Sequence, residues 1–511
     1  MAIGFLVVSL LLTFYYRHLR KRRNLPLPPG PKKLPLIGNL LDVPAEYEWK
    51  QYTSWGEEFG SDIIHLDVAG KSIIVLNSVE TAHDLLDYRS AIYSSRPIST
   101  MVSELIGWKW LFGFIPYNRT WRERRRQFQQ HLGRSNTSIH EPRELHFAHI
   151  LLQQLLNSPE NFMEHIRHMT GAITLSIAYG IDLKHSNDPV LVLAEKAQSN
   201  MLSAAIPGKY LVDAFPILRH VPEWIPGAGF QKKAKEMKKE MIEYMTVPFE
   251  MALERVEQGT VEPSFISLCL DSPKGGWKTS EDELLSIKAT AGQIFMAGAD
   301  TSVAALNTFI LAMTCFPEKQ KKAQEELDRV LMGRLPDHSD ISQLPYVQAI
   351  VKEVLRWQPV LPGGFAHYLI EDDEYLGYHI PAESIIIFNS WAMSRNEEDY
   401  PDPENFLPER FIKDGRLISD ITDPLDFSFG FGRRICPGKH IALTTISITI
   451  ASILTAFSIV KPIDKDGNIV HPSREYTSSP ISHPVLFKCS IKPRSREALA
   501  LIRSLSPVET M

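Results

Sequence analysis

The segment from Phe429 to Lys439, FGFGRRICPGK, places one cysteine in a turn of glycine, proline and arginine. A thiolate is a strong, soft ligand for iron, and Cys436 can stay ionised where backbone N–H groups and a following helix N-terminus offset its charge. Gly432 and Gly438 allow the backbone to approach a flat ligand closely. Arg434 could pair with a carboxylate on that ligand. The alternative is a buried structural cysteine, as most unpaired cysteines are.

The overall composition limits the classes of protein and of metal site that are expected. The chain has 511 residues, 44% hydrophobic and 23% charged, which is ordinary for a globular protein. Its net charge of −5 gives no electrostatic indication of nucleic-acid binding. The four cysteines are far apart and form no CxxC pair, so neither an iron–sulfur cluster nor a zinc knuckle is expected.

Polar residues interrupt a long apolar run between residues 281 and 313. The sequence AGADTS includes Gly298, Asp300 and Thr301, and buried polar groups are costly unless they have partners. One interpretation is a hydrogen bond from the Thr301 hydroxyl to the preceding helical turn. The other is a helix that opens beside a reactive centre.

Two further pairs have helical spacing. Glu353 and Arg356, in EVLR, share one helix face and can form a buried ion pair. Trp121 and Arg125 are one turn apart in an arginine-rich helix, in which we expect Arg122, Arg124 and Arg126 to form a solvated face.

The pattern Phe429-x-x-Gly432-x-Arg434-x-Cys436-x-Gly438 resembles the haem-binding signature of the cytochrome P450 family at every fixed position. Within that family the chain resembles microsomal members, especially the fungal enzymes of secondary metabolism. The resemblance implies haem b with Cys436 as the axial iron ligand. It also implies that the cofactor is bound by Phe429, Gly432, Arg434, Gly438, Trp121, Arg125 and His367. The segment PGGFAH before His367 departs from the commoner family sequence.

The resemblance gives roles to the remaining motifs. Glu353 and Arg356 would meet Arg410 of PERF in a structural triad, Thr301 and Asp300 would relay protons, and Gly298 would leave room for dioxygen. By position, the substrate pocket would be lined by Phe295, Met296, Ala297, Leu361, Phe365 and Ile481. Because these walls are mostly apolar, we expect a lipophilic substrate.

The implied activity is insertion of one oxygen atom from O2 into a terpenoid or similar polycyclic metabolite. The alternatives are an aromatic, indole or polyketide substrate, or a haem-thiolate isomerase or dehydratase that needs no reductase. Electrons would come from NADPH through a separate NADPH-cytochrome P450 reductase. An acidic partner of that kind would suit the basic residues Arg433, Lys439 and Arg124.

To hold the candidate site residues in place, we expect a mostly α-helical body with a small β portion, which is the cytochrome P450 fold that the resemblance implies. Alternation predicts a hairpin over residues 62–78 and a strand over 384–388, SIIIF. Helical periodicity holds from about 121 to 356. It predicts an amphipathic helix over 230–245, a buried helix over 281–313 and a last helix over 441–457.

The N-terminus predicts attachment to a membrane. Residues 1–23 contain the apolar run IGFLVVSLLLTFYY followed by RHLRKRR, a membrane anchor helix with a basic stop. Residues 24–40 are a proline-rich hinge, expected to be a rigid spacer. Residues 41–511 form the haem-thiolate monooxygenase domain. The charge order predicts a cytosolic catalytic domain at the endoplasmic reticulum membrane.

Overall fold

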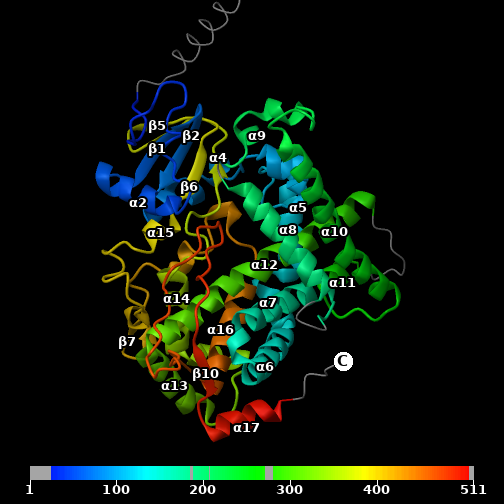
Figure 1. Ribbon diagram of the computed structural model, residues 1–511, viewed down its shortest axis with the longest axis vertical. Coiled ribbons are helices and arrows are strands. Elements are labelled where there is room, and N and C mark those ends of the chain that lie inside the picture. Colours follow the sequence, from blue (N-terminus) through cyan, green and yellow to red (C-terminus); the bar gives the residue numbers. More distant parts are fainter. Residues whose placement is uncertain (1–24, 184–187, 207, 271–279, 506–511) are drawn as a thin grey trace, which may run out of the picture.

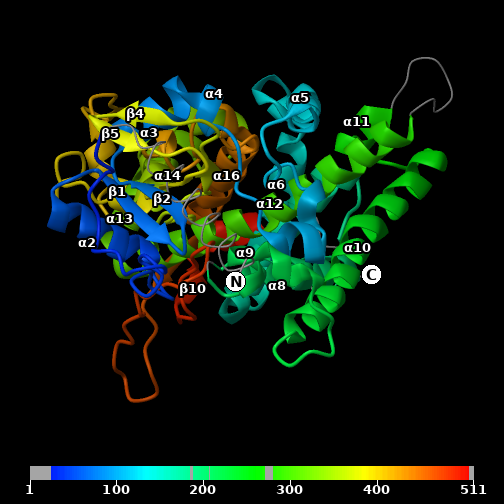
Figure 2. The ribbon, with the colours of Figure 1, turned by 90° about the horizontal axis from the view of Figure 1, so that it is seen from above.

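The computed structural model describes residues 25–183, 188–206, 208–270 and 280–505, so the predicted anchor over residues 1–23 lies outside the described residues. The described chain is mostly helical and carries four small sheets (Figure 1), which confirms the predicted balance of helix and strand. Seen from above, the largest sheet and α10 lie on opposite sides of the molecule (Figure 2).

The longer helices are α2 (Glu48–Phe59), α5 (Arg119–Leu132), α6 (Glu141–Asn157), α7 (Phe162–Tyr179), α8 (Pro189–Ala205), α10 (Gly229–Glu257), α12 (Glu281–Cys315), α13 (Pro317–Leu331), α14 (Pro345–Trp357), α16 (Lys439–Ala456) and α17 (Arg496–Ser504). The short helices are α3 (Val79–Ala82), α4 (Ser90–Tyr93), α9 (Leu211–Ala214), α11 (Phe265–Leu270) and α15 (Ser390–Met393). The strands are β1 (Ile63–Val68), β2 (Lys71–Leu76), β3 (His367–Tyr368), β4 (Asp373–Tyr375), β5 (Tyr378–Ile380), β6 (Ile385–Phe388), β7 (Ile412–Lys413), β8 (Arg416–Leu417), β9 (Phe457–Val460) and β10 (Ser490–Pro493).

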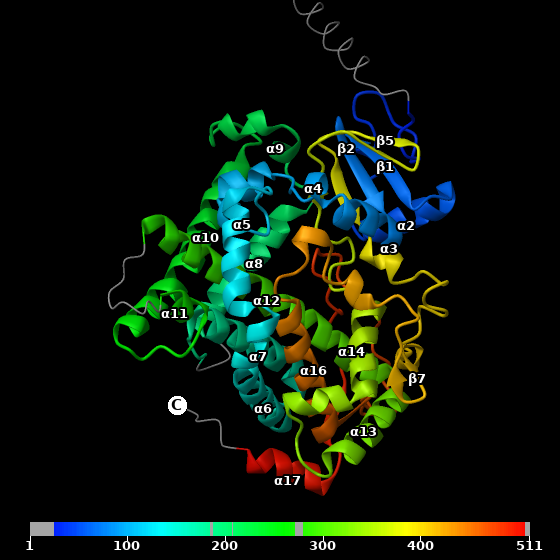
Figure 3. The ribbon, with the colours of Figure 1, turned by 180° about the vertical axis from the view of Figure 1, so that it is seen from behind.

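Helix α12 is the central element, as its apolar sequence predicts. Its N-terminus is capped by Ser280, whose side chain accepts a hydrogen bond from the Glu283 N–H, and three acidic residues occupy the first turn. It packs against α7 and α16, and Figure 3 shows α16 beside α12 and α14. Among the described residues, α12 and α16 are long and apolar enough to cross a membrane, but both are mostly buried in the body.

The largest sheet has the order β1-β2-β6-β3 and holds the segment that contains His367. The predicted hairpin is confirmed, with Ile63 opposite Leu76, and the predicted strand near 384–388 is β6, parallel to β2. Strand β3 pairs with β6 so that His367 lies opposite Ile386. The sheet therefore brings His367 close to the N-terminal third of the chain.

The proline-rich hinge packs on the body where it is described. The carbonyl of Pro29 accepts a hydrogen bond from the His65 N–H at 2.8 Å, and that of Pro26 accepts one from the His379 N–H at 2.8 Å. A side chain at position 30 would meet the carbonyl oxygen of His65 at 2.1 Å. The described part of the segment thus packs on β1 and β5, and its role as a rigid spacer stays a prediction.

Two predicted helices have different bounds. The amphipathic segment 230–245 is the first half of α10, which continues through Pro248 to Glu257. The last helix begins at Lys439, two residues earlier than predicted, and Phe457 starts β9 instead of ending the helix. The earlier start places the N-terminus of α16 three residues after Cys436.

Candidate functional site

The Cys436 turn joins a short 3₁₀ helix, Gly432–Arg434, to the N-terminus of α16. The Cys436 N–H donates to the carbonyl of Phe429 at 2.8 Å, which closes the turn. Gly438 is the N-cap of α16 and has no capping side chain, so the first N–H groups of the helix stay available. The Cys436 residue is partly accessible, and a Cβ at Gly438 would lie 4.0 Å from its Sγ.

Opposing influences act on the Cys436 thiol. Burial raises its pKa, while the backbone N–H of Gly438, the Arg125 guanidinium and Lys439 lower it, and burial is the larger effect. A positive iron at Sγ would add the missing charge and keep the sulfur ionised. The turn therefore suits a metal-bound thiolate better than a free one.

Three buried arginines, Arg96, Arg125 and Arg434, surround this turn and are called the arginine cluster below. Arg125 Nη1 donates to the carbonyl of Ile435 at 2.7 Å. Arg434 donates to three carbonyls, of which Ser94 is closest at 2.7 Å, and Arg96 donates to the carbonyl of Phe365 at 2.6 Å.

The arginine cluster contains no carboxylate. Within the described residues none of its guanidiniums forms an ion pair, and burial followed by repulsion from Arg125 lowers the pKa of Arg434. Burial and then the charge of Arg434 hold the pKa of Arg96 well below its usual range. Buried positive charges of this kind require anions. Haem carries two carboxylates, so the residues present fit the group that the sequence indicates.

His367 and Trp121 both lie beside the arginine cluster. His367 Nδ1 is 2.9 Å from the carbonyl of Tyr93, and burial followed by the charge of Arg96 holds its pKa well below the usual range. The guanidinium of Arg434 lies 4.5 Å from the centre of the Trp121 ring. The segment 93–96 thus contacts both His367 and Arg434 and contributes Arg96.

One strip of α12 is open although the helix is otherwise buried. Gln293, Ala297 and Thr301 are spaced by four residues and are partly or fully exposed, so they share one face. The Thr301 hydroxyl donates to the carbonyl of Ala297 at 2.8 Å, the bond to the preceding turn that the sequence left open. Its oxygen lone pairs still face the open strip and can accept a hydrogen bond.

Two predicted pocket residues lie elsewhere. Phe295 is fully buried and stacks on Tyr244, with ring centres 5.8 Å apart, and meets Tyr179 edge-on. Met296 is also buried in the main core, and its carbonyl accepts a hydrogen bond from Gln198. Helical spacing turns both away from the face that carries Ala297, so they pack in the core and do not line the open strip.

Asp300 points away from the open strip into an ion-pair cluster. Its Oδ1 is 2.8 Å from Arg167 Nη1, and its Oδ2 is 3.2 Å from His483 Nε2. Burial raises the pKa of this carboxyl, but the hydrogen bond and charge of His483, together with Arg167, outweigh burial and lower it overall.

Two glycines serve packing rather than the ligand. A Cβ at Gly298 would lie 2.4 Å from Thr174 Cγ2, so this glycine allows α12 to approach α7 and does not open space for dioxygen. Gly432 has φ +56°, and a Cβ there would lie 2.0 Å from the carbonyl oxygen of Leu86. Its close approach is to protein backbone, unlike the approach to a flat ligand that the sequence predicts.

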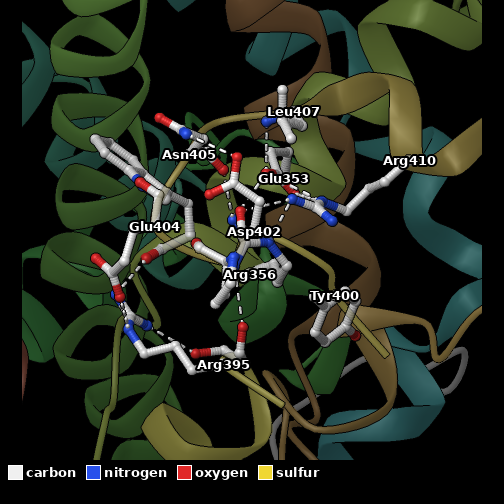
Figure 4. Close-up of polar contacts among 12 residues, drawn as sticks. Glu353, Arg356, Arg395, Tyr400, Asp402, Glu404, Asn405, Leu407 and Arg410 are labelled. Carbon is white, nitrogen blue, oxygen red and sulfur yellow. Dashed lines mark hydrogen bonds and ion pairs between the residues drawn. The ribbon is translucent and has the colours of Figure 1, made fainter. Parts of the chain in front are cut away.

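The Glu353 triad, Glu353 with Arg356 and Arg410, joins α14 to the segment 402–410 (Figure 4). Arg356 meets both carboxylate oxygens of Glu353 at 2.8 Å, and both side chains are 0% exposed. Arg410 Nε is 3.3 Å from Glu353 Oε2. The Leu407 N–H also donates to Glu353, so the buried carboxylate has a complete set of partners.

The remaining pocket candidates come together from distant segments. Leu361 and Phe365 are partly exposed, and Phe365 packs edge-on against Phe114. The Ser482 N–H donates to the carbonyl of Val360 at 3.0 Å, which brings buried Ile481 beside this segment. Gly364 has φ +64° and lies against the Phe388 carbonyl, which fixes the unusual PGGFAH turn.

Some functional residues were missed or misplaced. Arg124 is buried and bonds the Trp110 carbonyl, so it does not belong to a solvated face; Arg122 and Arg126 are exposed as predicted. Arg96, Arg167 and His483 carried no sequence signal, because each has a contact in the site with a residue more than a hundred positions away.

Comparison with known proteins gives consistent matches along the chain. The family described as Cytochrome P450 has a model that matches residues 28–484. Cytochrome P450 monooxygenase ple1 of Rhodocybe pseudopiperita is 47% identical over 491 residues, which are 96% of this chain and 94% of that protein. Cytochrome P450 monooxygenase 98 of Postia placenta is 45% identical, covering 95% and 94%. Tryptamine 4-monooxygenase of Psilocybe cyanescens is 39% identical, covering 97% and 98%.

Proposed function

The chain belongs to the cytochrome P450 family of monooxygenases, and from this premise we propose that it inserts one oxygen atom from O2 into a lipophilic terpenoid or similar polycyclic metabolite. Membership implies a haem-thiolate iron cofactor, O2, a small-molecule substrate and a redox partner. The carrying observation is the Cys436 turn beside an arginine cluster that has no carboxylate of its own.

In this proposal Cys436 would ligate the iron of haem b, and the propionates would be held by Arg96, Arg125, Arg434, Trp121 and His367. When bound, the haem supplies the oxygen-activating redox chemistry. Phe429 closes the turn by accepting the Cys436 N–H, and Gly438 starts α16 so that its N–H groups face the sulfur. Gly432 shapes the turn through its contact with Leu86.

The chain's own proton-handling groups would be Thr301 and Asp300. The Thr301 hydroxyl lies on the open strip, held by its bond to Ala297, and can donate or accept a proton there. Asp300, the residue before it in the chain, is charged and is held by Arg167 and His483. The Glu353 triad would hold α14 and the segment 402–410 rigid behind the cofactor.

A lipophilic substrate is supported by the groups available on the open side of α12. Ala297, Leu361 and Phe365 are apolar, and Ile481 lies beside them. An amine would need a free carboxylate, whereas Asp300 is committed to Arg167 and His483. The alternative remains an aromatic, indole or polyketide substrate, because one relative is named tryptamine 4-monooxygenase.

The proposed electron source is a separate NADPH-cytochrome P450 reductase. Arg433 is exposed at the Cys436 turn, and Lys439 is partly exposed while its Nζ bonds the Leu425 carbonyl at 2.8 Å. The exposed Arg122 and Arg126 of α5 take the place of buried Arg124 in this surface. Such a basic surface suits an acidic partner.

We also infer attachment to the endoplasmic reticulum membrane, with residues 1–23 as the anchor and the catalytic domain, 41–511, in the cytosol. Exposed apolar side chains support it at one end of the molecule, where α9 and the β1–β2 hairpin lie (Figure 1). Those side chains are Leu36, Leu41, Leu211, Phe215, Ile217 and Trp224. Lys71 Nζ contacts the Asp213 carbonyl at 2.5 Å, which joins the two regions.

Co-expression with a reductase and a panel of terpene scaffolds tests the proposal, with products identified by mass. We expect products that gain one oxygen atom and depend on NADPH. Cys436→Ala should lose the thiolate-type spectrum of the reduced, carbon monoxide-treated protein and all oxidation. Full activity in that variant would contradict the assignment, and turnover without reductase would favour the haem-thiolate isomerase or dehydratase.

A further inference from the structure

The carboxylate of Asp300 lies between two cations that come from different parts of the chain. Arg167, on α7, approaches Oδ1, and His483, in the C-terminal segment after the core helix α16, approaches Oδ2. Glu195, on α8, lies 3.9 Å from Arg167 Nε and completes the set of charged groups around the site. Both Asp300 oxygens are therefore occupied, and neither faces the open strip of α12.

The side chains form a path of increasing exposure. The Asp300 side chain is 9% exposed, that of His483 is 19% exposed and that of Arg167 is 36% exposed. Arg167 reaches solvent, but a guanidinium does not release its proton in proteins. Among the described side chains that contact Asp300, His483 alone has a ring that can both give up a proton and take one from water.

The backbone at His483 is held by hydrogen bonds to Thr477. The His483 N–H donates to Thr477 Oγ1 at 3.0 Å, and the Thr477 N–H donates to the His483 carbonyl at 2.8 Å. The Ser482 hydroxyl donates to the Thr477 carbonyl at 3.0 Å. These bonds place residue 483 beside α12, where its Nε2 lies 3.2 Å from Asp300 Oδ2.

We propose that His483 passes protons from solvent to Asp300, and that Arg167 is the fixed counter-charge that orients Asp300 between transfers. In each transfer the Nε2–H bond of the imidazolium breaks, an O–H bond forms at Asp300 Oδ2, and the electron pair of the N–H bond stays on nitrogen. Solvent then returns a proton to the imidazole. Neutral Asp300 is held less strongly by Arg167 and can turn towards Thr301. The inference rests on the proposed oxygenase function.

The test uses the purified full chain with haem, a reductase and NADPH in air, without added substrate. Reduction of O2 to peroxide consumes one NADPH, whereas reduction to water consumes two and needs more protons. His483→Gln keeps an N–H donor for Asp300 but cannot titrate. We expect its water-to-peroxide ratio to fall roughly tenfold, less than for a group that touches the reacting atoms.

The pH dependence separates proton supply from packing. In the wild type the water-to-peroxide ratio should fall as pH rises, because fewer imidazolium groups are left to supply protons. In His483→Gln this dependence should disappear, whereas Arg167→Gln should change the ratio but keep the dependence. The matched control is His471→Gln, an exposed histidine of the same C-terminal segment, which should behave as wild type.

The outcomes distinguish this inference from the proposed function. A wild type without the thiolate-type carbon monoxide spectrum overturns both. A wild type with that spectrum, together with a His483→Gln variant that keeps the wild-type ratio and pH profile, overturns the proton path alone. The spectrum of each variant shows that it has folded with haem, and His483→Asn replaces the glutamine variant if the latter loses the spectrum.

Discussion

Two groups of buried arginines in the described chain differ in how their charge is neutralised. In the Glu353 triad, one carboxylate faces two guanidiniums and also accepts the Leu407 N–H (Figure 4). In the arginine cluster, Arg96, Arg125 and Arg434 donate only to carbonyl oxygens and, within the described chain, face no carboxylate.

The triad neutralises its own charges and so stabilises the folded chain, whereas the arginine cluster keeps positive charge available for an anionic ligand. A buried charge with its partner in the same chain is neutralised as soon as the chain folds. A buried charge without one is a cost to the unliganded protein that an anionic ligand removes, so part of the binding free energy becomes folding stability. We therefore expect substitutions in the two groups to act on different states of the protein.

Removal of the triad carboxylate should have the largest effect. Glu353→Gln keeps the volume but leaves Arg356, which is 0% exposed, and Arg410 without a counter-charge. Breaking a buried pair in this way costs about 3–5 kcal/mol. The free energy of unfolding from urea titrations should fall by that amount both with and without haem.

The control is Glu123→Gln, on α5. Glu123 is 44% exposed and pairs with Arg119, which is 87% exposed, so its substitution should cost no more than about 1 kcal/mol. Equal losses for the two variants would mean that the triad is no more than a surface ion pair in energy.

Glu144 sharpens the comparison because it is a buried carboxyl without an arginine. Its Oε1 accepts hydrogen bonds from Thr444 and Thr445 of α16, while His338 Nε2 is 3.5 Å from Oε2. Burial raises the pKa of Glu144 to about 8, although both threonine hydrogen bonds lower it. Where Glu353 is neutralised by cations, Glu144 is neutralised by a proton.

The pH dependence follows from that pKa. The folded state holds a proton that the unfolded state releases above pH 4.5, so stability from this group falls as pH rises from 4.5 to about 8. Glu144→Gln cannot ionise and should be more stable than wild type by roughly 2–3 kcal/mol at pH 9. At pH 4 the two should unfold alike. Parallel curves throughout would show that His338 supplies the missing charge.

The sequence predicted those features that depend on neighbours in the chain. Helical periodicity located α12, alternation located the β1–β2 hairpin, and the spacing of Glu353 and Arg356 placed both on one face of α14. Each of these needs only a few consecutive residues to be defined.

Features that arise from packing could not be predicted in the same way. Arg96 contacts residue 365 and His483 contacts residue 300, and nothing local to either marks the meeting. For the glycine at position 298 the sequence predicted room for dioxygen, whereas the packing of α7 places Thr174 where a side chain would extend. Only the tertiary structure shows which group limits the space at this glycine.

The arginine cluster gives the smallest stability change and the most direct test of the comparison. Arg125→Gln keeps a donor for the Ile435 carbonyl, the hydrogen-bond partner of Arg125 among the described residues, and removes a guanidinium whose pKa burial lowers. Without haem, the free energy of unfolding should therefore change by less than about 1 kcal/mol and can rise. With haem, loss of a partner for a carboxylate should raise the rate of haem transfer to apomyoglobin about tenfold, equivalent to about 1.4 kcal/mol.

Arg122→Gln, at an exposed position of the same helix, is the matched control and should leave both quantities unchanged. If Arg125→Gln instead destabilised the haem-free protein as strongly as Glu353→Gln, the cluster would be part of the folded framework, and the division between the two groups of arginines would fail.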